Sequence, residues 1–141
     1  MKDIRDRIKV NIDKSFHEKY IDLKIAAGKS YLDCPFSDFR EFFLLSAVIG
    51  VRNNLYIQLE KNKEGIFDSN VFSEHFDLPL LYTIAFAKEK NVDLLSDDDY
   101  VLRTVEGYAN GGFNTILSEI EDGSSNNLMN LATYLAELID S

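Results

Sequence analysis

The chain has 141 residues, of which 45% are hydrophobic, 12% aromatic and 28% charged. That length and apolar content fit one domain with a core of its own and exclude an intrinsically disordered chain. Fifteen basic and 24 acidic residues give a net charge of −9 at pH 7, which argues against nucleic-acid binding over the whole surface.

The single cysteine and the hydropathy pattern exclude further classes of protein. Cys34 stands alone, which excludes an intramolecular disulfide and a cysteine-based zinc site, and it is expected to be a buried or half-buried small side chain. No apolar run is long enough for a membrane span, and the first residues lack the apolar segment of a secretory signal. We therefore expect a soluble, cytoplasmic protein.

Charge is unevenly distributed along the chain. Residues 1–30 hold eight basic and five acidic residues, a net charge of +3, whereas residues 31–141 hold seven basic and 19 acidic residues, a net charge of −12. The acidic body can be a solvated surface that keeps the protein in solution. Alternatively, the basic start is a contact surface on a body that repels anions.

The first predicted elements are a strand and a helix. Residues 7–12 alternate polar and apolar side chains, which favours a strand, although isoleucine at every fourth position also fits a helix. Ser15 and Glu18 form the pattern of a capping box, which predicts a helix from Ser15 to Ala27 that Gly28 stops.

The middle of the chain predicts a central helix and a small hairpin. Ser37 is expected to cap a helix over Phe39–Val51, whose side chains are apolar on almost every side, so this helix should lie in the middle of the fold. Residues 55–59 and 65–67 are apolar and flank a polar stretch, which allows a small hairpin between them.

The second half predicts only helices. Asp77-Leu78-Pro79 begins one, and Ser96 with the three aspartates that follow it begins another. Gly111 and Gly112 are expected to end that helix at a tight corner, before a short helix over 113–120 and a last helix after Ser125. The fold class is thus mainly α: a single domain over residues 1–141, with five to six helices, a short N-terminal strand and the small hairpin.

Candidate catalytic and metal-binding residues are few. Asp97, Asp98 and Asp99 lack the spacing of a calcium loop and fit the positive end of a helix dipole. His17 and His75 have no second His or Cys at ligand spacing. We therefore predict no catalytic residue, no metal and no cofactor, and a nuclease that uses Asp97–Asp99 or His75 is the least favoured function.

The basic strand supplies an alternative function. Arg7, Lys9 and Asn11 would share its outer face, and such side chains bond phosphates and base edges when a two-stranded ribbon enters the major groove. The order of strand, helix and helix is similar to ribbon-helix-helix repressors, in which two copies pair their strands, although residues 28–36 are longer than the turn of that motif. The strand could equally pair with residues 56–59 of its own chain.

Two stretches resemble a known family. Residues 35–54, Pro-Phe-Ser-Asp-Phe-Arg-Glu-Phe-Phe-Leu-Leu-Ser-Ala-Val-Ile-Gly-Val-Arg-Asn-Asn, resemble the small proteins associated with DNA phosphorothioation (Dnd) systems, which carry a similar phenylalanine-rich helix. Residues 106–113, Glu-Gly-Tyr-Ala-Asn-Gly-Gly-Phe, are similar to a second stretch of that family. The tail after Gly123 carries no such resemblance.

The resemblance implies a setting in bacterial defence, beside machinery that modifies or restricts DNA, and it carries over no catalytic residue. We therefore predict a non-enzymatic accessory or adaptor protein that acts by contact with a protein of that machinery. The alternative is a dimeric DNA-binding regulator that reads DNA with Arg7, Lys9 and Asn11. The polar residues of the two stretches form the candidate functional surface: Arg40, Arg52, Asn53 and Asn110.

Overall fold

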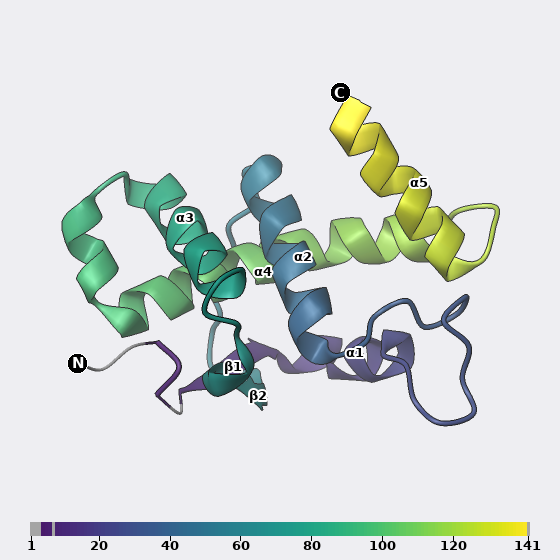
Figure 1. Ribbon diagram of the computed structural model, residues 1–141, viewed down its shortest axis with the longest axis horizontal. Coiled ribbons are helices and arrows are strands. Elements are labelled where there is room, and N and C mark those ends of the chain that lie inside the picture. The colour runs from purple at the N-terminus through teal and green to yellow at the C-terminus, as the bar shows by residue number, and fades with distance from the viewer. Residues whose placement is uncertain (1–3, 7, 141) are drawn as a thin grey trace.

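The computed structural model describes residues 4–6 and 8–140 and confirms the mainly α fold class. Five helices and one two-stranded sheet make up the regular structure of that part of the chain (Figure 1). In chain order they are β1 (Lys9–Asp13), α1 (His17–Leu23), α2 (Phe39–Arg52), β2 (Lys63–Asp68), α3 (Asp77–Glu89), α4 (Asp98–Glu121) and α5 (Asn127–Asp140). None of the described helices is both long and apolar enough to cross a membrane.

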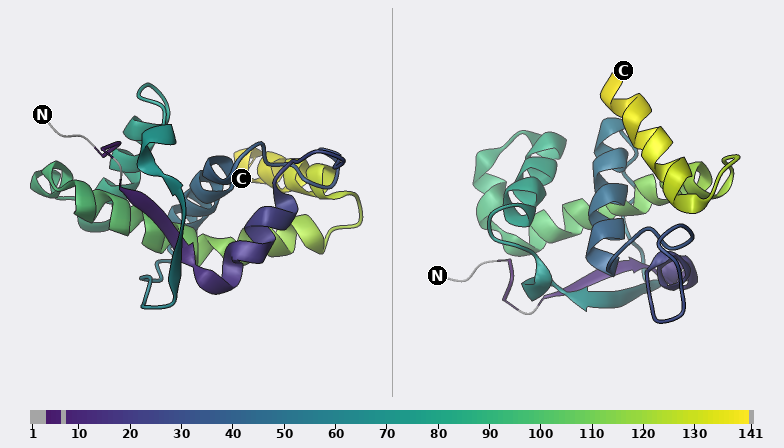
Figure 2. Two further views of the ribbon diagram at one scale, coloured as in Figure 1. Left: turned by 90° about the horizontal axis from the view of Figure 1, so that it is seen from below. Right: turned by 45° about the vertical axis from the view of Figure 1, so that its right-hand side comes forward.

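Helix α4 is the axis of the molecule. It runs along the whole length, with α3, α2 and α5 on one side and the sheet and α1 on the other (Figures 1 and 2). Aromatic rings fill the space between α1, α2 and α4: Phe42 stacks on Tyr20 with ring centroids 4.3 Å apart and lies 5.6 Å from Phe113. The prediction that residues 39–51 form the central helix is confirmed, because α2 is buried on most of its surface.

The expected corner at Gly111 and Gly112 is wrong, because α4 continues through both glycines as one helix of 24 residues. The two glycines do not form a turn; they allow other backbone segments to approach α4 closely. A Cβ atom on Gly112 would lie 2.7 Å from the backbone nitrogen of Gly50 in α2, and one on Gly111 would lie 2.5 Å from the carbonyl carbon of Leu55. Backbone therefore packs directly on backbone where α2 crosses α4.

The first helix is shorter than expected. A 3₁₀ turn over Lys14–Phe16 precedes α1, and Asp13 caps it in place of Ser15, since the backbone N–H of Ser15 donates to Asp13 Oδ1 (2.9 Å). The helix ends at Leu23, well before Gly28, because the next residues turn extended and the N–H of Ile25 donates to the carbonyl oxygen of Phe36 (2.8 Å).

In two later helices the capping residue is the one directly after the expected serine. Asp38 caps α2, where its Oδ1 accepts from the N–H of Glu41 (2.9 Å), and Asp97 caps α4, where its Oδ1 accepts from the N–H of Tyr100 (3.1 Å). Each time an aspartate follows the serine, and its carboxylate also carries the negative charge that the helix dipole favours.

The predicted strand is confirmed over Lys9–Asp13, but the predicted hairpin is wrong. β1 pairs antiparallel with β2, with Val10 opposite Phe67 and a shift in register before Asn11. Residues 55–57 do not pair with either strand; they lie along α4, where the N–H of Ile57 donates to the carbonyl oxygen of Gly107 (3.1 Å). The close approach at the α4 glycines therefore takes this segment away from the sheet.

Candidate functional site

An apolar groove lies between α2 and α3. It has a volume of about 480 Å³ and is lined mainly by aliphatic side chains. The lining residues are Val48, Val51, Arg52, Leu80, Thr83, Ile84 and Ala87. Exposed apolar surface gathered in a groove is typical of a site for a partner side chain or helix. The exposed Arg52 is the only charged residue in that lining.

The two walls of the groove are fixed at their N-terminal ends by an ion pair. Arg40 in the first turn of α2 donates to Asp77 Oδ2 at the start of α3 (2.8 Å), and the same oxygen accepts from the N–H of Ser73 (2.8 Å). Asp77 is buried, whereas Arg40 is half-buried. Arg40 therefore holds the first turn of α3 against the first turn of α2. It lies about 18 Å from Arg52 along the axis of α2, so the two arginines do not share one site.

Replacing Arg40 with methionine is expected to destabilise the protein by roughly 2 kcal/mol, because it leaves the buried Asp77 carboxylate without its cation. Urea unfolding followed by circular dichroism measures the change. A second replacement, Asp77→Asn, should recover part of the loss when it is added to Arg40→Met. A double variant that is less stable than the sum of the two single variants would contradict this role of the ion pair.

The other residues of the candidate surface do not form one patch. Asn53 is the exposed residue that ends α2, next to Arg52. Asn110 is buried in α4, where its Nδ2 donates to the carbonyl oxygen of Ile57 (2.9 Å). Asn110 thus holds the segment after α2 against α4. The structure brings Arg52 and Asn53 together at the end of the groove and places Arg40 and Asn110 elsewhere.

The residues of the DNA-reading alternative lie at β1. Arg7 lies outside the described residues. Lys9 forms an ion pair with Asp68 on β2 (3.1 Å). The N–H of Asn11 donates to Glu106 Oε2 (2.6 Å), on the side of β1 away from β2.

Side chains of α4 thus occupy the edge of β1 that a second copy would need for pairing. Arg103 donates to the carbonyl oxygen of Lys9 on the same edge (3.2 Å). The strand pairs within its own chain, and in this arrangement it offers no free edge from Lys9 to Asn11 to form a ribbon across a dimer. DNA contact through this segment stays a prediction.

Glu106 is a buried carboxylate that the sequence analysis missed. Its side chain is 1% exposed, and it accepts from Arg103 (2.9 Å) as well as from Asn11. Burial raises its pKa to about 7, although Arg103, Asn11 and Lys63 act to lower it. The signal was present in the sequence, because Glu106 falls on the same helical face as the buried Leu102 and Phe113.

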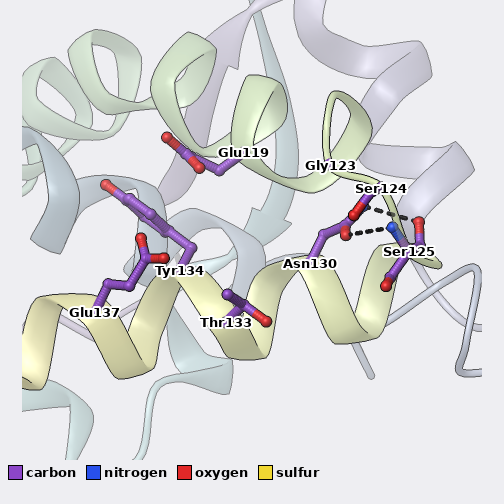
Figure 3. Close-up of a pocket in the computed structure, with 8 residues that line it drawn as sticks. All are labelled: Glu119, Gly123, Ser124, Ser125, Asn130, Thr133, Tyr134 and Glu137. Carbon is purple, nitrogen blue, oxygen red and sulfur yellow. Dashed lines mark hydrogen bonds between the residues drawn. The ribbon is translucent and has the colours of Figure 1, made fainter.

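A polar pocket of about 180 Å³ lies at the other end of the molecule, between the last turns of α4 and the helix α5. Its lining is Glu119, Gly123, Ser124, Ser125, Asn130, Thr133, Tyr134 and Glu137. Figure 3 shows Tyr134 and Glu137 projecting from α5 toward α4, which contributes Glu119. The buried Asn130 shapes one wall, since its Nδ2 donates to the carbonyl oxygens of Ile120 (2.8 Å) and Ser125 (3.0 Å).

The residues considered for metal or catalytic chemistry are dispersed. Asp97 caps α4, and Asp99 pairs with Arg103 (3.5 Å). His17 contacts Glu64 (2.9 Å), and His75 is exposed in the turn before α3. Within residues 4–6 and 8–140, no group of three or more His, Cys, Asp or Glu side chains could hold a metal ion. Cys34 is buried, as expected, and its thiol donates to the carbonyl oxygen of Asp22 (3.2 Å).

Comparison with known protein families identifies a matching family. A family model described as DNA sulphur modification system-associated protein 4 matches residues 7–140. No curated protein and no solved structure matches the chain. The family match confirms the resemblance of residues 35–54 and 106–113 and extends it over α5, which those stretches do not reach. In the fold, the two stretches are α2 and the middle of α4, which pack on each other.

Proposed function

Because the chain belongs to the family described as DNA sulphur modification system-associated protein 4, we propose that it is a non-enzymatic accessory protein of such a system, acting in the bacterial cytoplasm by contact with another protein of it. The observation that carries the proposal is the apolar groove between α2 and α3. We propose that it receives an amphipathic helix of the partner, with apolar side chains in the groove and an acidic residue beside Arg52.

The composition of the groove supports a protein as the ligand. Val48 and Thr83 are exposed on its two walls, and the Thr83 hydroxyl already donates its proton to the carbonyl oxygen of Pro79 (2.8 Å). Little polarity is left for a sugar or a nucleotide, whose recognition requires several placed polar groups. The charge of −12 on residues 31–141 also disfavours contact with a phosphate backbone.

The proposal that the chain is not an enzyme draws on the roles of its carboxylates. Asp97 and Asp99 act at the start of α4 as a cap and as the partner of Arg103. Asp77 is held by Arg40 and Ser73. These interactions account for those side chains without a reaction, which supports a role in assembly.

The test is co-purification of the tagged protein after co-expression with the proteins of a DNA sulphur modification system. Val48→Asp is expected to lower the recovery of the partner about tenfold, because the complex would bury a carboxylate against aliphatic side chains. The matched control is Val92→Asp, which makes the same change at an exposed valine outside the groove. Circular dichroism verifies that both variants fold.

Two results would count against the proposal. If the wild-type protein recovers no protein of the system, an adaptor role is wrong. If Val48→Asp recovers as much partner as Val92→Asp does, the contact lies on another surface.

A further inference from the structure

Helix α5 is apolar on two opposite sides, and the described part of the chain covers the inner one. That inner side packs on α4 and contains the buried Leu131 and Tyr134. Figure 2 shows α5 at the edge of the molecule, and its opposite side carries four exposed apolar residues: Met129, Ala132, Ala136 and Ile139. Their spacings of three, four and three place them on one strip of the helix surface, nearly opposite the inner side. We call these four residues the outer face of α5.

The outer face is apolar along its whole length. Ile139 is 83% exposed and Met129 is 50% exposed, and the half-buried Leu128 and Leu135 border the face on one side. Beside the first turn of α5, the N–H of Leu128 donates to the carbonyl oxygen of Leu32 (3.0 Å), whose side chain is also exposed. Exposed apolar residues at this regular spacing are typical of a helix that packs against another helix.

The charges of α5 are reversed relative to its helix dipole. Glu137 and Asp140 lie in the last turns, beside the negative end of the dipole, whereas the first turn holds no acidic residue at the positive end. No basic residue occurs in α5. A neighbouring helix that runs antiparallel and carries the same charges would relieve this, because each C-terminal carboxylate would lie beside the positive end of the other helix. A parallel copy would instead place Asp140 beside Asp140.

The spacing of the outer face is also self-complementary. When two copies of α5 cross antiparallel at a two-fold axis midway between Ala132 and Ala136, Ala132 of each copy faces Ala136 of the other. In the same register, Met129 of each copy faces Ile139 of the other. The alanines at the centre let the helix axes approach closely, and the larger side chains fill the two ends. From these observations we propose that the protein forms a homodimer through the outer faces of two antiparallel α5 helices.

This dimer differs from the strand-paired dimer of the DNA-reading alternative, because it leaves β1 paired with β2 of its own chain. It also leaves the groove between α2 and α3 for another protein, because the outer face lies on a different helix. The dimer does not rest on the proposed function, and the purified protein alone tests it. One helix of about 21 Å from each copy makes a small interface, so we expect a dissociation constant in the micromolar range.

The first test is sedimentation velocity of the full chain over micromolar to millimolar concentrations. The wild type is expected to change from monomer to dimer over that range. Ala136→Glu should raise the dissociation constant at least tenfold, because dimerisation would bury a carboxylate against apolar side chains. The matched control is Thr133→Glu, which adds the same side chain at an exposed position on the polar side of α5 and should dimerise as the wild type does. Circular dichroism verifies that both variants fold.

Disulfide formation tests the antiparallel register. Met129→Cys and Ile139→Cys are oxidised separately and as an equimolar mixture, and the native Cys34 is buried in both. We expect the mixture to form a disulfide-linked dimer at least tenfold faster than either variant alone. In the proposed register, two cysteines at position 129 would lie about 15 Å apart along the helix axis, which is beyond the reach of a disulfide.

Three results would overturn the proposal. A wild type that stays monomeric at millimolar concentration would exclude the dimer. Equal dimerisation of Ala136→Glu and Thr133→Glu would place the interface on another surface. If each cysteine variant alone reacts as fast as the mixture, the helices do not pack in this antiparallel register. Should the wild type be monomeric while Ala136→Glu loses a co-purified protein that Thr133→Glu retains, the outer face binds that protein and not a second copy.

Discussion

Gly112→Ala is expected to lower the free energy of unfolding by about 3 kcal/mol and the melting temperature by roughly 10 °C. The added methyl group would point at the backbone of α2, including the carbonyl oxygen of Ser46 and the nitrogen of Gly50. Backbone atoms cannot rotate away as a side chain does, so α2 must shift. The gain of about 1 kcal/mol that alanine normally brings to a helix is too small to offset that shift.

Thermal unfolding monitored by circular dichroism measures this effect. The control is Asn114→Ala, an exposed position two residues further along α4, where the same new residue should be neutral or slightly stabilising. If Gly112→Ala is as stable as the wild type, α2 and α4 do not pack backbone on backbone at this position.

The helices were predictable where a periodic apolar pattern met a local start signal. Asp77-Leu78-Pro79 begins α3 as expected, because proline at the first turn costs no hydrogen bond. The caps of α2 and α4 were predicted within one residue, since an aspartate directly follows the expected serine at both starts. Ends were harder to predict, as α1 shows, because the residues after Leu23 leave the helix to pair with Phe36, a contact that sequence patterns do not reveal.

The glycines of α4 show why the second half was misread. Two adjacent glycines are typical both of a helix end and of a helix that another backbone approaches closely. The choice between these depends on α2, which is some 60 residues earlier in the chain. The partner of the first strand was mispredicted for the same reason, because it depends on distant contacts. Residues 55–57 are as apolar as a strand, but Gly107 and Asn110 hold them against α4.

The candidate sites depended even more on tertiary structure. Arg52 was selected from the sequence and does line the groove, but the groove exists only because α2 and α3 leave space between them. The polar pocket joins residues of α4 and α5, and no motif in the sequence relates Glu119 to Tyr134. Glu106 is the exception, because its place on an apolar helical face could have been found by periodicity alone.

As the pH rises from 4.5 to about 7, the free energy of unfolding of the wild type is expected to fall by about 3 kcal/mol relative to that of Glu106→Gln. The pKa of Glu106 is raised from 4.5 to about 7 in the folded protein, mainly by burial. In that window the folded state holds a proton that the unfolded state has released. The protonated Glu106 carboxyl therefore makes its full contribution to stability below pH 4.5, and this contribution is lost as the pH rises through 7.

Urea unfolding of both proteins at pH 5, 6, 7 and 8 isolates this group, because the other titrations are common to the two proteins and cancel in the difference. Glutamine keeps an oxygen that can accept from the N–H of Asn11, so the variant should still fold. Direct NMR titration of the Glu106 carboxyl carbon should give a midpoint near 7. A midpoint near 4 would mean that Arg103 and Asn11 outweigh burial, and the wild type would then gain stability with pH relative to the variant. The sign of that slope thus shows whether desolvation or the bonds to Arg103 and β1 govern the buried carboxylate.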